Sequence, residues 1–266
     1  MEWQWLMAFL ALGVVVGFLA GLLGIGGGGV MVPVLTAIFI AKDFPSEQVV
    51  HMALATSMAA IVPTAFASLR AYQSKGAIAW PIVWQITPGI LLGTFAATFL
   101  ATYLSSEVLA IFFACFMAYV ALQMWLGAKP QPHREVPGIV GLSLAGLVIG
   151  AVSALVAIGG GSLTVPFLMW CNVNIRNAIA TSAAVGFPIA LAGTLGYLVN
   201  GWSVQGLPTY TIGFVYWPAV IMIAASSFFT TRMGAHLAHS LPVNTLKKAF
   251  AVLVVLLSLK MLSSVL

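Results

Sequence analysis

Two glycine runs are the strongest candidates for a binding site in this sequence. The first run is Gly26, Gly27, Gly28 and Gly29, and the second is Gly159, Gly160, Gly161 and Ser162. Each glycine costs about 1 kcal/mol relative to alanine inside a helix, so a run of them breaks the helix. The next helix then begins with backbone N–H groups that have no intrahelical acceptor, and its dipole adds positive potential. The runs therefore predict an anion site, with tight helix packing at small residues as the alternative.

Two pairs of hydroxyl side chains form a second candidate group. They are Thr56 with Ser57 and Thr181 with Ser182. Each pair lies inside an apolar segment and precedes a proline. Such hydroxyls can donate to a ligand, or they can simply bond to a carbonyl of their own helix. Because the pair occurs twice, we expect all four hydroxyls to supplement the anion site.

A titratable or cationic residue stands five positions before each hydroxyl pair, namely His51 and Arg176. Arg176 could attract an anion and His51 could relay a proton, whereas the alternative for both is an interfacial anchor. His236 and His239 have no third ligand near them in the sequence, so no metal site is predicted. The sequence also lacks the common nucleotide-binding and hydrolase motifs, which argues against an enzyme and against a cofactor.

The composition restricts the class of protein that must position these residues. Of 266 residues, 62% are hydrophobic and 6% are charged, against about 25% charged in soluble domains. This excludes a soluble enzyme, a secreted disulfide scaffold and a disordered chain. Basic residues are scattered, so the net charge of +5 does not indicate nucleic-acid binding. The acidic residues all fall at segment ends or in loops, which disfavours a cation as the substrate.

Ten apolar segments predict an all-α polytopic membrane protein. They cover approximately 4–24, 28–41, 49–72, 80–103, 108–126, 138–157, 161–171, 178–199, 212–237 and 246–262. The second and seventh are short, and each is led by a glycine run. A polar linker, 129–137, divides the chain into a first repeat, 1–128, and a second repeat, 138–266.

The two halves carry the same sequence pattern. GFLAGLLGIGGGGVMVPVL at 17–35 matches GAVSALVAIGGGSLTVPFL at 150–168 with an offset of 133. Further matches follow at an offset of 125, including Tyr72 with Tyr197, and at an offset of 137, including Trp80 with Trp217. Five segments in each half place the second half upside down relative to the first. The pattern therefore predicts two inverted repeats, as in many secondary transporters.

The distribution of basic residues predicts the orientation. Two topologies fit the segments: every segment crosses the bilayer in turn, or each glycine-linked pair of segments enters the bilayer and returns to the same side. In both, Lys42 and Lys260 lie on the side of the N-terminus. The opposite side then holds Arg70, Lys75, Lys129, Arg134, Arg176, Arg232, Lys247 and Lys248. Because basic residues favour the cytoplasmic side, both termini are predicted to lie outside the cytoplasm.

The stretches GLLGIGGGGVMVPVL, ALVAIGGGSLTVPFL, HMALATS and RNAIATS resemble the sulfite exporter TauE/SafE family, also called the toluene-sulfonate uptake permease family. The resemblance covers about residues 5–265. It implies transport of sulfite, sulfonates or other small anions across a bacterial inner membrane.

We therefore expect a secondary transporter that works by alternating access. An anion channel and a non-transporting membrane subunit remain the alternatives. The expected partners are the lipid bilayer and a small anion, and the sequence leaves a homo-oligomer open.

Overall fold

Ten helices run through the computed structural model, which describes residues 3–23, 27–126, 135–237 and 243–265. The first five are α1 (Trp3–Leu23), α2 (Gly28–Ala41), α3 (Val49–Gln73), α4 (Trp80–Ala101) and α5 (Ser106–Leu126). The second five are α6 (Ile139–Val156), α7 (Gly161–Trp170), α8 (Ile175–Asn200), α9 (Trp217–Leu237) and α10 (Val243–Val265). The predicted all-α fold is confirmed, and both short helices begin where their glycine runs place them.

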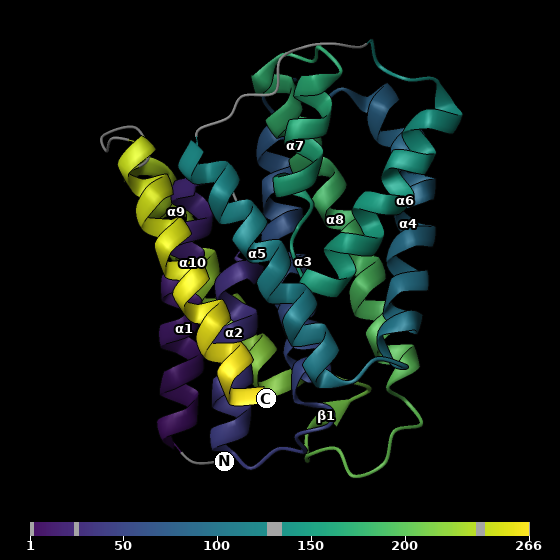
Figure 1. The fold of residues 1–266 in the computed structure, drawn as a ribbon. Coiled ribbons are helices and arrows are strands. Elements are labelled where there is room, and N and C mark those ends of the chain that lie inside the picture. Colours follow the sequence, from purple (N-terminus) through teal and green to yellow (C-terminus); the bar gives the residue numbers. More distant parts are fainter. Residues whose placement is uncertain (1–2, 24–26, 127–134, 238–242, 266) are drawn as a thin grey trace.

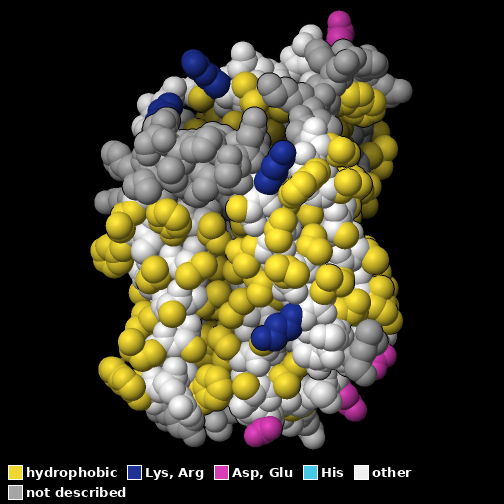
Figure 2. All heavy atoms as spheres, turned by 60° about the vertical axis from the view of Figure 1, so that its left-hand side comes forward, with side chains coloured by type: hydrophobic (Ala, Val, Ile, Leu, Met, Phe, Trp, Pro, Cys, Tyr) yellow, Lys and Arg dark blue, Asp and Glu magenta, His cyan; other side chains and the backbone are white. Residues whose placement is uncertain are grey.

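The surface of the bundle is that of a membrane protein. Seven of the described helices are long and apolar enough to cross a bilayer, whereas α2 and α7 are shorter. Large hydrophobic side chains such as Trp84, Leu92 and Phe229 are well exposed. Figure 2 shows hydrophobic side chains over the middle of one face, with acidic side chains confined to its two ends. Lipid is the solvent that such a surface requires.

The ninth predicted segment begins later than its apolar run indicated. Residues 212–216 were predicted to be helical, but they belong to a hairpin of β1 (Thr211–Ile212) and β2 (Val215–Tyr216). Gly213 turns the chain with a positive φ of 55°, which glycine adopts at little cost. The helix starts only at Trp217, where Pro218 in the first turn favours initiation.

The helices of one half pack against those of the other in a reciprocal way. Helix α1 packs along α9, and its predicted counterpart α6 packs along α4; α3 packs against α8, and α5 against α10. Glycines permit the two close pairs, because Gly17 meets the backbone of Ser227 and Gly150 meets the backbone of Ile90. The start of α1 and the end of α10 lie at the same end of the bundle (Figure 1). An inverted repeat requires this arrangement, and the repeat relation itself stays a prediction.

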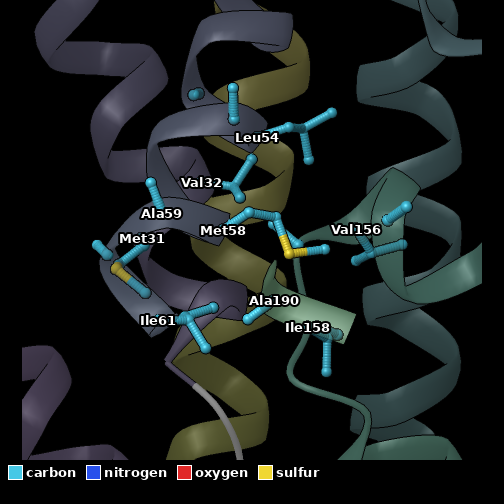
Figure 3. Packing of buried hydrophobic residues seen from close by; sticks show 14 of the residues in the cluster. Met31, Val32, Leu54, Met58, Ala59, Ile61, Val156, Ile158 and Ala190 are labelled. Atoms are coloured by element: carbon cyan, nitrogen blue, oxygen red, sulfur yellow. The ribbon is translucent and has the colours of Figure 1, made fainter. Parts of the chain in front are cut away.

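The core lies where the two glycine breaks meet. Met58 of α3, Ile158 of the α6–α7 break and Ala190 of α8 are fully or almost fully buried there (Figure 3). Tyr197 of α8 is the largest of the fully buried side chains. The two breaks touch one another here, because a Cβ atom at Gly28 would run into the carbonyl oxygen of Ala157.

Several predicted features lie outside the described residues. They are Gly26, most of the linker 129–137, and His239.

Candidate functional site

One cavity, of about 410 Å³, lies between the two halves of the bundle. Its walls come from the second half of α3, the first half of α8, the ends of α1 and α9, and both glycine breaks. Thr231 of α9 and Ala183 of α8 are among its lining residues. The cavity reaches the surface at Lys75, an exposed residue just beyond α3. Among the lining residues in the described part of the chain, Lys75 alone carries a charge.

The glycine breaks converge on this cavity. Gly27, Gly159 and Gly161 line it, and α2 and α7 begin at Gly28 and Gly161. Neither helix has a side-chain cap at its N-terminus. Their first N–H groups therefore lack the usual acceptor, and the positive ends of both helix dipoles lie beside the cavity. This arrangement favours an anion.

The geometry of the second break takes one donor away from the predicted set. The N–H of Gly160 donates to the carbonyl oxygen of Ile158 at 2.7 Å, so it does not point to a ligand. Gly160 has a φ of 77° and Ala157 a φ of 51°, and these two left-handed residues reverse the chain between α6 and α7. The N–H groups of Gly161 and Ser162, at the start of α7, have no acceptor within the helix.

A polar strip on α3 forms a wall of the cavity that sequence reasoning missed. It consists of Thr64, Ser68 and Tyr72 of α3 and continues in Lys75, just beyond the end of the helix. The signal was present, because Thr64, Ser68 and Tyr72 recur every four positions and so share one face of the helix. The strip leads from the protein surface toward the glycine breaks.

The predicted hydroxyl pairs are divided by the structure. Ser182 lines the cavity, and its hydroxyl donates to the carbonyl oxygen of Ile179 at 2.9 Å. Thr56, Ser57 and Thr181 are buried and do not line the cavity. Of these hydroxyls, only Ser182 is therefore placed to meet a ligand in this conformation.

Thr56 and Thr181 instead connect the two halves. The hydroxyl of Thr56 accepts the backbone N–H of Tyr216 at 3.1 Å, and that of Thr181 accepts the N–H of Ala79 at 3.0 Å. Tyr216 and Ala79 each precede the Trp-Pro pair that starts α9 or α4. Each threonine thus fixes the beginning of a helix from the opposite half.

Replacing Thr56 or Thr181 with valine is expected to destabilise the protein by about 1–3 kcal/mol, because a buried N–H (Tyr216) or a partly buried one (Ala79) loses its acceptor. Thr56→Ser and Thr181→Ser retain the hydroxyl and serve as controls. Unfolding of the detergent-purified proteins by denaturant, followed by circular dichroism, measures the difference. Equal stability of the valine and serine variants would contradict this role.

His51 and Arg176, the predicted relay residues, lie apart from the cavity. His51 is buried, its Nε2 donates to the carbonyl oxygen of Ala101 at 2.8 Å, and its ring stacks on Phe214 with centroids 5.3 Å apart. Arg176 is exposed in the first turn of α8, which the side chain of Asn174 caps. Neither residue lines the cavity.

Within the described ranges, no group of three His, Cys, Asp or Glu side chains could hold a metal ion. The described lining of the cavity offers backbone N–H groups, hydroxyls and the ammonium group of Lys75.

Comparison with known proteins places this architecture in a family. The sequence model of the family "Sulfite exporter TauE/SafE" matches residues 9–261. A probable membrane transporter protein of Haemophilus influenzae is 38% identical over 95% of this chain and 96% of its own length. The probable membrane transporter protein YunE of Bacillus subtilis is 23% identical over the same shares. A probable membrane transporter protein of Methanocaldococcus jannaschii is 25% identical over 85% of this chain and 83% of its own length. No solved structure matches. The chain belongs to the sulfite exporter TauE/SafE family of membrane transporters.

Proposed function

We propose that this transporter is a secondary carrier of a small anion, which binds in the cavity beside the two glycine-led helix starts. The observation that carries the proposal is the convergence of two uncapped helix N-termini on one cavity whose described lining holds no acidic side chain. An anion there would accept hydrogen bonds from the first N–H groups of α7, and the dipoles of α2 and α7 would stabilise its charge.

The proposed path to this site follows the polar strip on α3. Lys75 would attract the anion at the surface, and the hydroxyls of Ser68 and Thr64 would lie along its way inward. In this conformation the hydroxyl of Thr64 donates to the carbonyl oxygen of Ile61 at 2.8 Å, so it must turn away from that carbonyl before it can donate to an anion. The substrate class follows from the family resemblance: sulfite, a sulfonate, or another organosulfur or carboxylate anion.

In the proposed mechanism, the two inverted repeats rock against one another and expose the site to one side of the membrane at a time. The cavity lies at the end of the bundle that carries Arg70, Lys75 and Arg176, which the positive-inside rule assigns to the cytoplasm. The conformation described here is then open to the cytoplasm, with both termini outside. The proposed location is the bacterial inner membrane, a homo-oligomer stays a prediction, and no enzymatic step is involved.

The test is the thermal stability of the detergent-purified protein with a panel of anions at matched ionic strength and pH. The panel holds sulfite, sulfate, thiosulfate, sulfoacetate, a simple sulfonate and acetate, with chloride as the reference. An anion at 100 times its dissociation constant should stabilise the protein by about 2.7 kcal/mol. Saturable uptake with counterflow in proteoliposomes would then identify a carrier, whereas conductance without counterflow would identify an anion channel. No shift and no flux with any anion, in protein shown to be folded, would favour a non-transporting subunit.

A further inference from the structure

Two tyrosines at equivalent positions of the two repeats have different surroundings. Tyr72 of α3 lines the cavity, whereas Tyr197 of α8, 125 positions later, is completely buried. The hydroxyl of Tyr197 donates to the carbonyl oxygen of Ala154 in α6 at 3.1 Å. Tyr197 therefore connects α8 to α6 through a buried hydrogen bond.

The acceptor of this hydrogen bond has a counterpart as well. Ala154 aligns with Gly21 at the offset of 133 that relates the two glycine runs. Gly21, at the end of α1, lines the cavity together with Tyr72. In the second half, Tyr197 and Ala154 are joined by a hydrogen bond. Their counterparts in the first half, Tyr72 and Gly21, both line the cavity instead.

The same difference extends along the helices that carry the tyrosines. Ala65 and Ala67 of α3 line the cavity, whereas their counterparts in α8, Ala190 and Ala192, are 0% and 8% exposed. Every residue of α3 from Val49 to Ile61 is buried, and α3 has no buried residue beyond them. The two halves therefore present equivalent surfaces in two states, one open and one closed.

The closed end is held by further contacts that come from both halves. Asn200 at the end of α8 donates to the hydroxyl of Thr98 in α4 at 3.2 Å. Beside it, Phe214 next to β2 stacks on His51, and the ring of Tyr216 lies 5.7 Å from that of Phe39 between centroids. Because α8 packs against α4 and α6, any separation of α8 from α6 breaks the hydrogen bond of Tyr197.

We infer that Tyr72 and Tyr197 are reciprocal gate residues of the transport cycle. In the state described here, Tyr197 holds the end opposite to the cavity closed through Ala154. In the alternate state, the hydroxyl of Tyr72 donates to the carbonyl oxygen of Gly21 and closes the present cavity, while Tyr197 lines a new one. This inference rests on the alternating access of the proposed function and assigns the contact that defines each state.

The test uses two cysteine reporters in a variant that carries Cys115→Ala and Cys171→Ala. Ala67→Cys reports water in the present cavity, and Ala192→Cys reports water at the end that is now closed. Each reporter is combined with Tyr197→Phe or with Tyr72→Phe, which remove only a hydroxyl. The rate of reaction with a charged, water-soluble maleimide is measured in detergent.

Removing one buried hydrogen bond is expected to change the ratio of the two states about fivefold. Tyr197→Phe weakens the state described here, so Ala192→Cys should react about fivefold faster. Tyr72→Phe weakens the alternate state, so Ala192→Cys should react about fivefold more slowly. Ala67→Cys should react readily in both backgrounds, because the present cavity remains the more populated opening.

Changes of the same sign in the two phenylalanine variants, or no change in either, would overturn the inference, since a merely structural tyrosine has no reason to act in opposite directions. If Tyr197→Phe does not fold, the slower reaction of Ala192→Cys expected in the Tyr72→Phe background is enough to test the inference. The experiment uses no substrate, so its outcome is separate from that of the anion panel. If anions bind but the two variants do not shift reactivity in opposite directions, only the gate inference is contradicted. If the reactivity shifts in opposite directions but no anion binds, only the proposed anion substrate is contradicted.

Discussion

Replacing Gly28 with alanine is expected to destabilise the protein by about 3 kcal/mol and to abolish transport. A Cβ atom at this position would run into the carbonyl oxygen of Ala157. That carbonyl belongs to the backbone of the α6–α7 break, where Ala157 is fully buried with a left-handed φ of 51°. The break cannot yield as a side chain would, so the start of α2 must move away from it, and overpacking of this kind is costly.

The matched control is alanine at the next residue, Gly29. Its Cβ atom would meet the sulfur of Met117 at 3.3 Å, and a methionine side chain can adjust. Alanine also favours the helix by about 1 kcal/mol relative to glycine, so Gly29→Ala is expected to change stability by no more than about 1 kcal/mol. Denaturant unfolding in detergent and uptake in proteoliposomes measure both variants. Similar stabilities would mean that the two glycine breaks do not depend on their mutual contact.

The positions of the glycine breaks could be predicted from the sequence because their cause is local. A run of glycines weakens any helix wherever it occurs, and the predicted starts of α2 and α7 are confirmed at Gly28 and Gly161. The lipid-facing surface follows in the same way from long apolar segments with few charges. Neither inference needs to know what lies beside the segment.

The roles of the two threonines could not be predicted, because their cause is tertiary. Thr56 binds the N–H of Tyr216, which lies 160 positions away. The presence of the equivalent Thr181 suggested a ligand-binding role. A structural contact that is repeated in both halves produces the same pattern of repeated residues. The hairpin that carries Tyr216 escaped prediction because Ile212, Phe214 and Val215 are as apolar as the helix that follows them.

The open or closed state of each half is also beyond the sequence. The predicted repeat places Tyr72 and Tyr197 at equivalent positions, yet Tyr72 lines the cavity while Tyr197 is buried where α8 packs against α4 and α6. The conformation of the whole chain then decides which half is open.

A phenylalanine at position 183 is expected to lower anion affinity about a hundredfold or more without unfolding the protein. Ala183 lies in the first half of α8 and lines the cavity, together with Gly161 at the start of α7. An aromatic ring in this space would exclude the anion from the N–H groups of α7. Two lost hydrogen bonds to a charged group, at about 1.5–3 kcal/mol each, account for the expected loss.

The control for this variant places the same ring outside the cavity. Ala96 of α4 is exposed among lipid-facing side chains such as Leu92 and Phe99, so Ala96→Phe adds equal bulk without touching the proposed site. Binding is measured as thermal stabilisation by whichever anion of the panel stabilises the unmodified protein, and transport as its saturable uptake. Because the ring fills open space, Ala183→Phe should unfold in the absence of anion at least as late as the unmodified protein. If Ala183→Phe and Ala96→Phe retain equal affinity, the anion binds elsewhere, and the glycine-led helix starts are packing elements alone.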